Sequence, residues 1–569
     1  MGHDTEVKKL LARIYGDEKG ARAAQRVLPL LETFPRQADR KSKEGFFSES
    51  DVVLITYGDS LHQPGEKPLT TLKRFAETHF RSTFSAIHIL PFYPYSSDDG
   101  FSVIDFYQVD PKIGSWEEVA ALRTDFELMV DFVLNHISAR SGWFKRYLAE
   151  TPGYTQLAIE VDPAVDLSMV VRPRSLPLLT ECQKDTGQTV HVWTTFSENQ
   201  VDLNYDSLDV LEQMVRVLLF YVEQGASMLR LDAVAYLWKE PGTPCIHLDE
   251  THAMVQLFRK ILDIVAPDVI LITETNVPHQ ENISYFGDGR NEAQMVYNFT
   301  LPPLLLHTFL TQNSSDLTHW AAGLGQSTPT TTFFNFTASH DGIGVRPLEG
   351  ILPDESVDWL ADHVLKNGGL ISYKRNPDGS ESPYELNVTY VDALFDTHSA
   401  GGDSLHADRF LASQTIQLSM PGVPGIYIHS ILGSRNWTDG VASTGRARTI
   451  NREKPMVSDI ISELEDPESL RHHIFNAYTH RIRVRRRQPA FHPTADCRVI
   501  ALDPRVFALE RRCPDQTIYA LVNVTPDTVE LSLPEAASSP PMVDLISGLE
   551  QGTVAIRLGP YQSVWLTPG

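Results

Sequence analysis

The chain has 569 residues, of which 42% are hydrophobic, so it can bury a large core and form more than one domain. Its 49 basic and 73 acidic residues give a formal net charge of −24. This charge argues against nucleic acid or an anionic membrane surface as the main partner, because both require a basic face.

The cysteines and the first residues give no sign of export. Cys182, Cys245, Cys497 and Cys513 form neither a CxxC pair nor a Cys/His cluster with zinc spacing, so we expect reduced thiols. The first residues lack the apolar core of a signal peptide, and no run approaches the roughly eighteen apolar residues of a membrane span. We therefore expect a cytoplasmic protein.

In chain order, residues 1–49 predict an N-terminal extension of amphipathic helices that carries no catalytic residue. From Asp51 onward, short apolar runs alternate with longer helical patterns. This alternation predicts an α/β fold, a (β/α)8 TIM barrel of parallel strands joined by helices. The predicted strands are residues 52–56, 86–91, 128–134, 226–231, 269–273, 295–299, 332–336 and 423–428.

Two gaps between predicted strands are too long for simple crossovers. We expect insertions at residues 138–206, after the third strand, and at 346–408, after the seventh; long loops in compact domains are often functional. After about residue 490, short alternating strands predict a C-terminal antiparallel β domain. The barrel would then comprise residues 50–137, 207–345 and 409–489.

Three carboxylates follow predicted strands. Arg230 and Asp232, spaced i and i+2, leave the end of one strand on the same side. Such a pair alone is more often an ion pair that caps a strand. Glu274 and Asp341, however, end two further apolar runs, and the C-terminal strand ends of a barrel carry its reacting groups. The sequence therefore predicts one site built on three carboxylates.

Short motifs around these residues resemble the α-amylase superfamily. The matching segments are 98–101, 133–136, 229–234, 272–274 and 339–341. Segments 54–57, 88–92, 340–344 and 421–424 are similar to its sucrose phosphorylase branch. Segments 193–197, 272–278 and 382–385 resemble the glucosylglycerate phosphorylases within that branch. The resemblance covers residues 50–490 and implies a glycoside phosphorylase that acts with retention.

Retention at a glucoside requires a carboxylate that attacks the anomeric carbon and a carboxylic acid that protonates the leaving oxygen. Asp232 suits the nucleophile, because Arg230 beside it favours the ionised form. Glu274 suits the general acid and base, because the apolar residues before it would keep it protonated. Asp341 matches the family's third carboxylate, which stabilises developing positive charge.

The resemblance also implies residues that hold substrate. Asp98, His136 and His340 match the family's glucose-holding residues, and Arg230 and Asn276 lie in matching motifs. Either histidine, taken alone, is more often a core or surface residue. The flanking motifs favour the sugar site for both.

Phosphate is best met by forked arginine donors. Arg172, Arg174, Arg435 and Arg448 lie in predicted loops, and a solvated surface charge is the alternative for each. Arg448 gains support from the motif Ile-Asn-Arg that follows it closely.

The acceptor side departs from the sucrose phosphorylase pattern. Those enzymes carry Tyr-Gln where this chain has Tyr384-Glu385, which puts fructose recognition in doubt. We expect a small acceptor such as glycerate, whose carboxylate pairs with Arg435 while Glu385 accepts a hydrogen bond from its hydroxyl.

The resulting hypothesis is phosphorolysis of 2-O-α-glucosylglycerate to α-glucose 1-phosphate and glycerate. A sucrose or glucosylglycerol phosphorylase, a hydrolase or transglucosidase, and a non-catalytic sugar-binding or scaffold barrel remain alternatives. The chemistry requires no cofactor, and the sequence shows no calcium loop. Expected partners are small molecules (α-glucoside, phosphate and glycerate), and a homodimer is left open.

Overall fold

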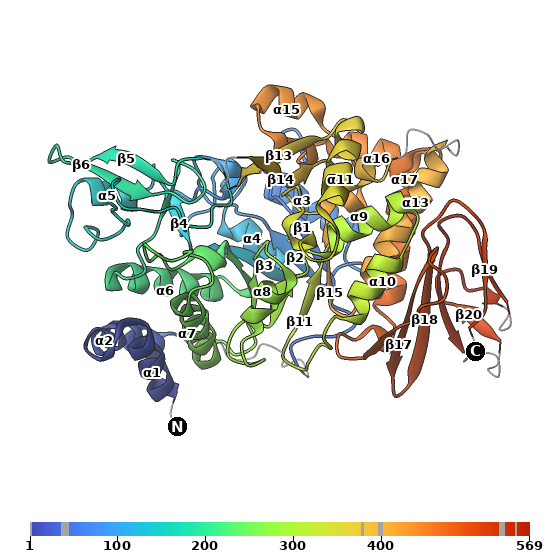
Figure 1. Ribbon diagram of the computed structural model, residues 1–569, viewed down its shortest axis with the longest axis horizontal. Coiled ribbons are helices and arrows are strands. Elements are labelled where there is room, and N and C mark those ends of the chain that lie inside the picture. Colours follow the sequence, from blue (N-terminus) through green and yellow to red (C-terminus); the bar gives the residue numbers. More distant parts are fainter. Residues whose placement is uncertain are drawn as a thin grey trace.

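A closed barrel of parallel strands forms the centre of the computed structural model, which describes residues 3–35, 45–174, 176–376, 380–395, 402–533, 541–551 and 555–568 (Figure 1). Around the barrel the strand order is β1-β15-β11-β10-β9-β8-β3-β2. The bounds are β1 Val53–Thr56, β2 Ala86–Ile89, β3 Glu127–Val133, β8 Ala226–Asp232, β9 Ile270–Thr273, β10 Met295–Tyr297, β11 Thr332–Asn335 and β15 Val423–Tyr427. Each falls on a predicted strand, so the predicted TIM barrel is confirmed.

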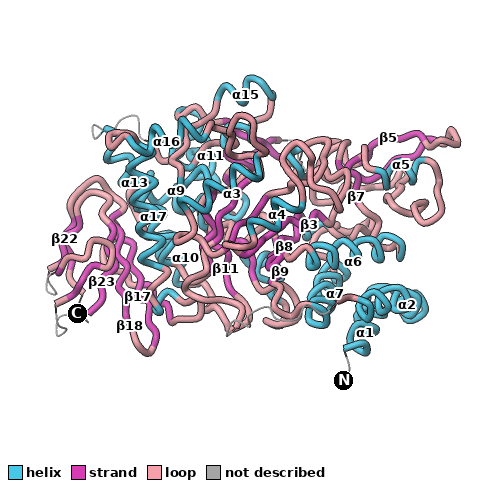
Figure 2. Tube along the Cα trace, turned by 180° about the vertical axis from the view of Figure 1, so that it is seen from behind, coloured by secondary structure: helices cyan, strands magenta, loops and turns pink. Residues whose placement is uncertain are grey.

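Helices surround the barrel because its strands are apolar on both faces and must be covered. Figure 2, viewed from the side opposite to Figure 1, shows these helices outside the strands. The principal ones are α3 Pro68–His79, α4 Trp116–Leu122, α6 Leu208–Glu223, α7 Asp249–Val265, α9 Leu301–Thr311, α10 Ser315–Ala322, α13 Gly402–Ser419 and α17 Leu470–Arg485. Shorter ones are η2 Val234–Tyr236, α8 His279–Ile283, η3 Ser284–Phe286, α14 Ile428–Ile431, α15 Thr438–Thr444, η5 Ala447–Asn451, α16 Val457–Glu465 and η6 Pro489–Phe491. In the described part of the chain, no helix has the length and apolar character needed to cross a membrane.

The N-terminal helices α1 His3–Tyr15 and α2 Asp17–Thr33 pack on α7 and α6 (Figure 1, dark blue). Their apolar residues face the barrel helices, and the Tyr15 hydroxyl donates a hydrogen bond to the Tyr205 carbonyl at 2.7 Å. They lie far from the barrel mouth, as expected for a segment without catalytic residues.

Two groups of small sheets flank the mouth of the barrel. After β3 come α5 Gly142–Leu148 and two antiparallel pairs, β4 His136–Ser138 with β7 Gln200–Asp202 and β5 Leu179–Gln183 with β6 Thr189–Trp193. After β11 come η4 Arg346–Leu348, α11 Asp354–Lys366, α12 Tyr390–Ala393 and the sheet β12-β14-β13, formed by β12 Ile343–Gly344, β13 Leu370–Arg375 and β14 Glu381–Asn387.

The C-terminal residues form antiparallel sheets at the opposite end of the molecule (Figure 1, red). The larger has the order β16-β17-β18-β23-β20-β21, and β19 pairs with β22. The bounds are β16 Asp496–Val499, β17 Val506–Cys513, β18 Gln516–Asn523, β19 Val529–Leu531, β20 Met542–Asp544, β21 Glu550–Gln551, β22 Ile556–Leu558 and β23 Ser563–Pro568. The domain boundaries given above stay a prediction.

A tight turn after β2, η1 Asp98–Gly100, carries Asp98 to the barrel mouth. Three successive residues have positive φ: 54° at Asp98, 46° at Asp99 and 114° at Gly100. A Cβ atom at Gly100 would lie 2.4 Å from the carbonyl oxygen of Pro91. Glycine is therefore required both for the backbone conformation and for the close approach.

We predict that Gly100→Ala lowers the free energy of unfolding by about 1–3 kcal/mol, because the new methyl group displaces the Pro91 backbone. Urea denaturation followed by circular dichroism measures the loss. Gly65→Ala is the control, since Gly65 also has positive φ (78°) but no atom within 4 Å of its Cβ position. Equal losses in the two variants would contradict the role of the Pro91 contact.

Candidate active site

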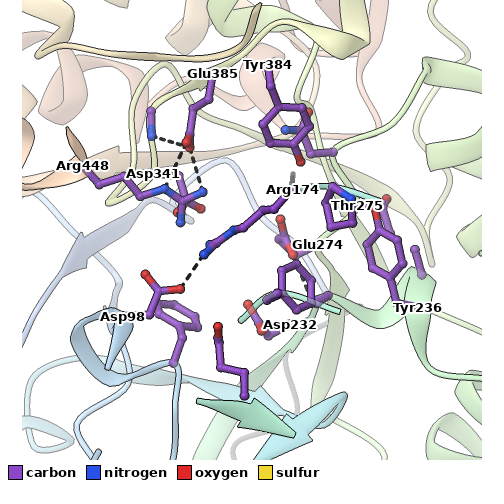
Figure 3. A pocket seen from close by; sticks show the side chains of 18 of the residues that line it. Asp98, Arg174, Asp232, Tyr236, Glu274, Thr275, Asp341, Tyr384, Glu385 and Arg448 are labelled. Atoms are coloured by element: carbon purple, nitrogen blue, oxygen red, sulfur yellow. Dashed lines mark hydrogen bonds and ion pairs between the residues drawn. The ribbon is translucent and has the colours of Figure 1, made fainter. Parts of the chain in front are cut away.

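A cavity opens at the C-terminal ends of the barrel strands (Figure 3). Its lining includes nearly all residues predicted for the site. The lining residues are Asp98, Phe101, His136, Pro173, Arg174, Phe196, Gln200, Asp232, Ala233, Ala235, Tyr236, Glu274, Thr275, Asn276, Val277, Phe299, His340, Asp341, Gly342, Tyr384, Glu385 and Arg448.

The three predicted carboxylates meet in this cavity. Asp232 is the last residue of β8, Glu274 directly follows β9, and Asp341 follows β11. Parallel strands end at the same rim of the barrel, which explains how residues far apart in sequence converge. Figure 3 shows Asp232 and Glu274 among the side chains that line the cavity.

One guanidinium holds the first two carboxylates. Arg230 Nη1 donates to Asp232 Oδ1 at 2.9 Å, and its Nη2 lies 3.9 Å from Glu274 Oε2. The same Nη1 also donates to Asp131, the Cα partner of Arg230 on β3. The Arg230 side chain is only 2% exposed, so these charges compensate one another with little help from water.

One further residue, His88, holds Asp131, and two aromatic rings cover the Arg230 guanidinium. His88 Nε2 lies 2.7 Å from Asp131 Oδ2, while the rings of Phe101 and Tyr297 lie 5.6 and 5.4 Å from the Arg230 guanidinium carbon. Sequence reasoning did not find Asp131 or His88, although Asp131 is a charged residue inside an apolar strand, and that exception was the available signal.

Burial and neighbouring charges shift the pKa values of the Asp232 and Glu274 carboxyls. Burial raises the pKa of Asp232 well above its ordinary value, and burial likewise raises the pKa of Glu274; Arg230 opposes both shifts. Neighbouring carboxyls ionise in turn rather than together, because the charge on one opposes ionisation of the other. Arg230 is hydrogen-bonded to Asp232 and more distant from Glu274, which favours the charge on Asp232 and the proton on Glu274.

Arg448 joins the third carboxylate to the acceptor side. Its Nη1 lies 2.6 Å from Asp341 Oδ1, and its Nη2 lies 2.9 Å from Glu385 Oε1. Glu385 also accepts a hydrogen bond from the backbone N–H of Gly342 at 2.8 Å. Although burial alone would raise it, Arg448 and His340 lower the pKa of Asp341, so this carboxylate is ionised.

The predicted histidines are buried and neutral. Burial lowers the pKa of His340 to about 3, and its ring stacks on Phe101 with the centroids 4.7 Å apart. Burial also lowers the pKa of His136, whose Nε2 donates to the Phe101 carbonyl at 2.9 Å. The buried His340 Nδ1 has no hydrogen-bond partner within the described structure, so a ligand can meet it without a charge, whereas His136 is already held by Phe101, Asn135 and Gln200.

Arg174 reaches across the cavity to Asp98, with Nη2 3.3 Å from Oδ2 (Figure 3). It also lies over the ring of Phe196, 5.7 Å from its centroid. Although burial opposes it, Arg174 and Arg448 lower the pKa of Asp98. Among the arginines predicted to meet an anion, Arg174 and Arg448 line the cavity.

Arg435, predicted to pair with the acceptor, lies apart from the other predicted site residues. Arg435 does not line the cavity: its Nε donates to Asp392, its guanidinium lies over Phe395, and its side chain is 49% exposed. Its loop turns toward α12, so the guanidinium serves as the partner of a buried carboxylate. Arg172 is also outside the cavity and donates to the Leu176 carbonyl.

Tyr384 and Asn276 complete the rim. Burial and the charge of Glu385 raise the pKa of Tyr384 to about 12, so it remains a hydroxyl donor. Asn276 Oδ1 is buried and has no hydrogen-bond partner within the described structure. A ligand group can satisfy it. Among the residues that the structure describes, no group of three or more potential metal ligands occurs.

Known proteins share this architecture. The model of the α-amylase catalytic domain matches residues 82–340. A glucosylglycerate phosphorylase from Spirochaeta thermophila is 47% identical over 99% of this chain and 98% of its own, and one from Escherichia coli is 46% identical over 99% of each. The crystal structure of sucrose 6F-phosphate phosphorylase from Thermoanaerobacter thermosaccharolyticum has a TM-score of 0.74 at 24% identity, covering 89% of this chain and 98% of that one.

Removal of the Arg230 guanidinium should destabilise the protein, because the buried carboxylates beside it lose their counter-charge. We predict that Arg230→Gln lowers the free energy of unfolding at pH 7 by about 3 kcal/mol, because Asp131 and Asp232 lose their cation. The deficit should shrink toward pH 5, since both carboxyls then take up protons more readily in the variant than in the parent protein.

Urea denaturation at the two pH values measures this effect. Arg216→Gln is the control, because Arg216 is 47% exposed and pairs with Glu212 on the surface of α6, where about 0.5 kcal/mol or less is at stake. A pH-independent deficit for the Arg230 variant would contradict the charge account.

Proposed function

The chain belongs to the glucosylglycerate phosphorylase family of the α-amylase superfamily, and we propose that it is a retaining glycoside phosphorylase that converts 2-O-α-D-glucosyl-D-glycerate and phosphate to α-D-glucose 1-phosphate and D-glycerate. The observation that carries this proposal is the near-complete coverage at 46–47% identity. The three carboxylates around one cavity support it.

The first half-reaction breaks the glucosidic bond. Glu274 gives its proton to the oxygen that joins glucose to glycerate, while an oxygen of Asp232 bonds to the anomeric carbon from the opposite face. Glycerate leaves, and a glucosyl ester remains on Asp232. Ionised Asp341 lies at the same cavity and stabilises the positive charge that develops on the sugar ring.

The second half-reaction transfers the glucosyl unit to phosphate. A phosphate oxygen attacks the anomeric carbon, its proton passes to Glu274, and the bond to Asp232 breaks. Two inversions restore the original configuration, and the protonated acid is ready for the next cycle. The same steps in reverse form glucosylglycerate from glucose 1-phosphate.

Glucose replaces Arg174 at Asp98 in this proposal. Asp98, His136 and His340 line the inner cavity, where a carboxylate and two neutral imidazoles suit sugar hydroxyls. The Arg174–Asp98 ion pair spans the same space, so sugar binding frees the guanidinium. Arg174 is then positioned to meet phosphate with parallel N–H donors.

Arg448 has a different role from Arg174. Its guanidinium is committed to Asp341 and Glu385, so it orients both carboxylates. Glu385 in turn is held by Arg448 and Gly342, and it shapes the acceptor site rather than facing it as a free carboxylate. The unpaired Asn276 Oδ1 is the acceptor for a glycerate hydroxyl.

The cysteines support a cytoplasmic location. Cys182, Cys245, Cys497 and Cys513 are all free thiols in the structure, which suits a reducing compartment. Sedimentation velocity will distinguish a monomer from the homodimer.

The reaction is tested by glucose 1-phosphate release from a panel of α-glucosides, with and without phosphate. We predict release from glucosylglycerate that depends on phosphate, with kcat/KM at least tenfold above that for sucrose or glucosylglycerol, because those acceptors lack the carboxylate. Glucose release independent of phosphate would favour a hydrolase or transglucosidase. No turnover of any glucoside would favour the sugar-binding or scaffold barrel.

A matched pair of arginine variants tests the phosphate site. We predict that Arg174→Gln raises KM for phosphate about tenfold or more, because a charge-assisted bidentate contact is lost. Arg435→Gln should change KM for phosphate and for glycerate less than twofold, since Arg435 lies outside the cavity. Steady-state kinetics in both reaction directions gives KM for phosphate and KM for glycerate in each of the two variants. A larger effect from the Arg435 variant would restore its predicted role as the glycerate ligand.

A further inference from the structure

A second hollow of about 420 Å³ adjoins the catalytic cavity. The two share Pro173, Arg174 and Tyr384, which form the wall between them. The outer hollow lies between residues 167–172 of the first insertion and the segment around Arg346. We call this hollow the vestibule, because it gives a ligand a route to the catalytic cavity beside Arg174 and Tyr384.

Cationic side chains dominate this vestibule. Arg172, Arg346 and Lys374 line it together with Arg174, whereas Glu349 is the carboxylate among the described lining residues. The loop that carries Arg172 and Arg174 belongs to the first insertion, whereas Arg346 lies in η4 and Lys374 in β13, so the fold brings charges from both insertions to the hollow.

Internal ion pairs neutralise only part of this positive charge. Within the described residues, Arg172 has no carboxylate within 4 Å. Its Nη2 donates a hydrogen bond to the neutral Leu176 carbonyl. Lys374 and Arg346 share Glu349, at 3.2 and 3.9 Å. Arg346 also lies 3.8 Å from Glu281, which is 43% exposed. An excess of positive charge therefore faces the hollow.

This local charge opposes the field of the whole chain. The chain carries a net charge of −24, which repels anions from most of its surface. In the proposed reaction, glucosylglycerate, phosphate, glycerate and glucose 1-phosphate are all anions. Each must enter or leave through the mouth of the cavity.

We propose that Arg172, Arg346 and Lys374 form an anion-collecting vestibule that concentrates carboxylate and phosphate ligands before they reach Arg174, an inference that rests on the proposed function. The groups attract the ligand at a distance and take no part in bond breaking. A neutral glucosyl donor gains nothing from them, so the vestibule favours charged substrates over neutral ones. Salt weakens this preference, because the Debye length falls from about 10 Å at 0.1 M to about 3 Å at 1 M.

Charge variants of Lys374 test the proposal. The readout is the ratio of kcat/KM for phosphate to kcat/KM for α-glucosyl fluoride, a neutral donor, in the full-length enzyme. In low salt, Lys374→Glu should lower this ratio about 3- to 10-fold, and Lys374→Gln should lower it by about the square root of that factor, because it changes half the charge. At 1 M salt both differences should disappear.

Lys9→Glu is the matched control, since Lys9 is exposed on α1, far from the mouth, and its change alters the net charge by the same amount. The control should keep the parental ratio. A Lys374→Glu ratio that equals the parental one in low salt, or that stays reduced at 1 M salt, would overturn the proposal.

The two proposals can fail separately. If the enzyme consumed α-glucosyl fluoride without any dependence on phosphate, the proposed function would be wrong. In that case the vestibule proposal would be tested by measuring the inhibition constant of inorganic phosphate against α-glucosyl fluoride turnover. A weaker inhibition constant in Lys374→Glu, restored by salt, would support it, and equal inhibition of the parent and the variant would overturn it.

Discussion

The guanidinium of Arg230 is the interaction on which the site depends. It is almost fully buried and contacts Asp131 and Asp232 while Glu274 lies just beyond hydrogen-bonding distance. Without it, the buried carboxyls of Asp131 and Asp232 would take up protons more readily, and Asp232 would lose the ionised form that the proposed mechanism needs. With it, Asp232 has a hydrogen-bonded cation and Glu274 does not, so ionisation is favoured at Asp232. A single cation therefore makes the two carboxyls unequal, as the proposed mechanism requires.

The barrel makes this arrangement possible. Asp131 and Arg230 are partners in the register of β3 and β8, so their side chains leave the sheet on the same face and meet inside the barrel. The strand ends then place Asp232 and Glu274 on one rim. Loops supply the outer wall, where Arg174 and Arg448 introduce positive charge into a strongly acidic chain.

The regular part of the molecule could be predicted from the sequence, because apolar strands alternate with amphipathic helices, and carboxylates follow three of the strands. The interior network could not. Asp131 lies within an apolar run, and its partner His88 belongs to another strand, so only the barrel register brings them to Arg230.

The conformation of the loops was the other feature that could not be predicted from the sequence. Arg174 and Arg435 lie in similar polar segments, yet the backbone path directs Arg174 into the cavity and Arg435 toward Asp392. Glu385 illustrates a third case: the sequence placed it on the acceptor side, but its commitment to Arg448 follows from side-chain geometry alone. Motifs therefore located the site, while loop conformation decided which charges face the ligand.

The most direct measurement is the identification of the residue that carries the glucosyl unit. Glu274→Gln enzyme incubated with α-glucosyl fluoride should accumulate the ester, because fluoride leaves without an acid whereas release requires a base. Mass spectrometry of the quenched, digested protein should find one added glucosyl unit on the peptide that contains Asp232. A unit on any other residue, or full turnover by Asp232→Asn, would contradict the account.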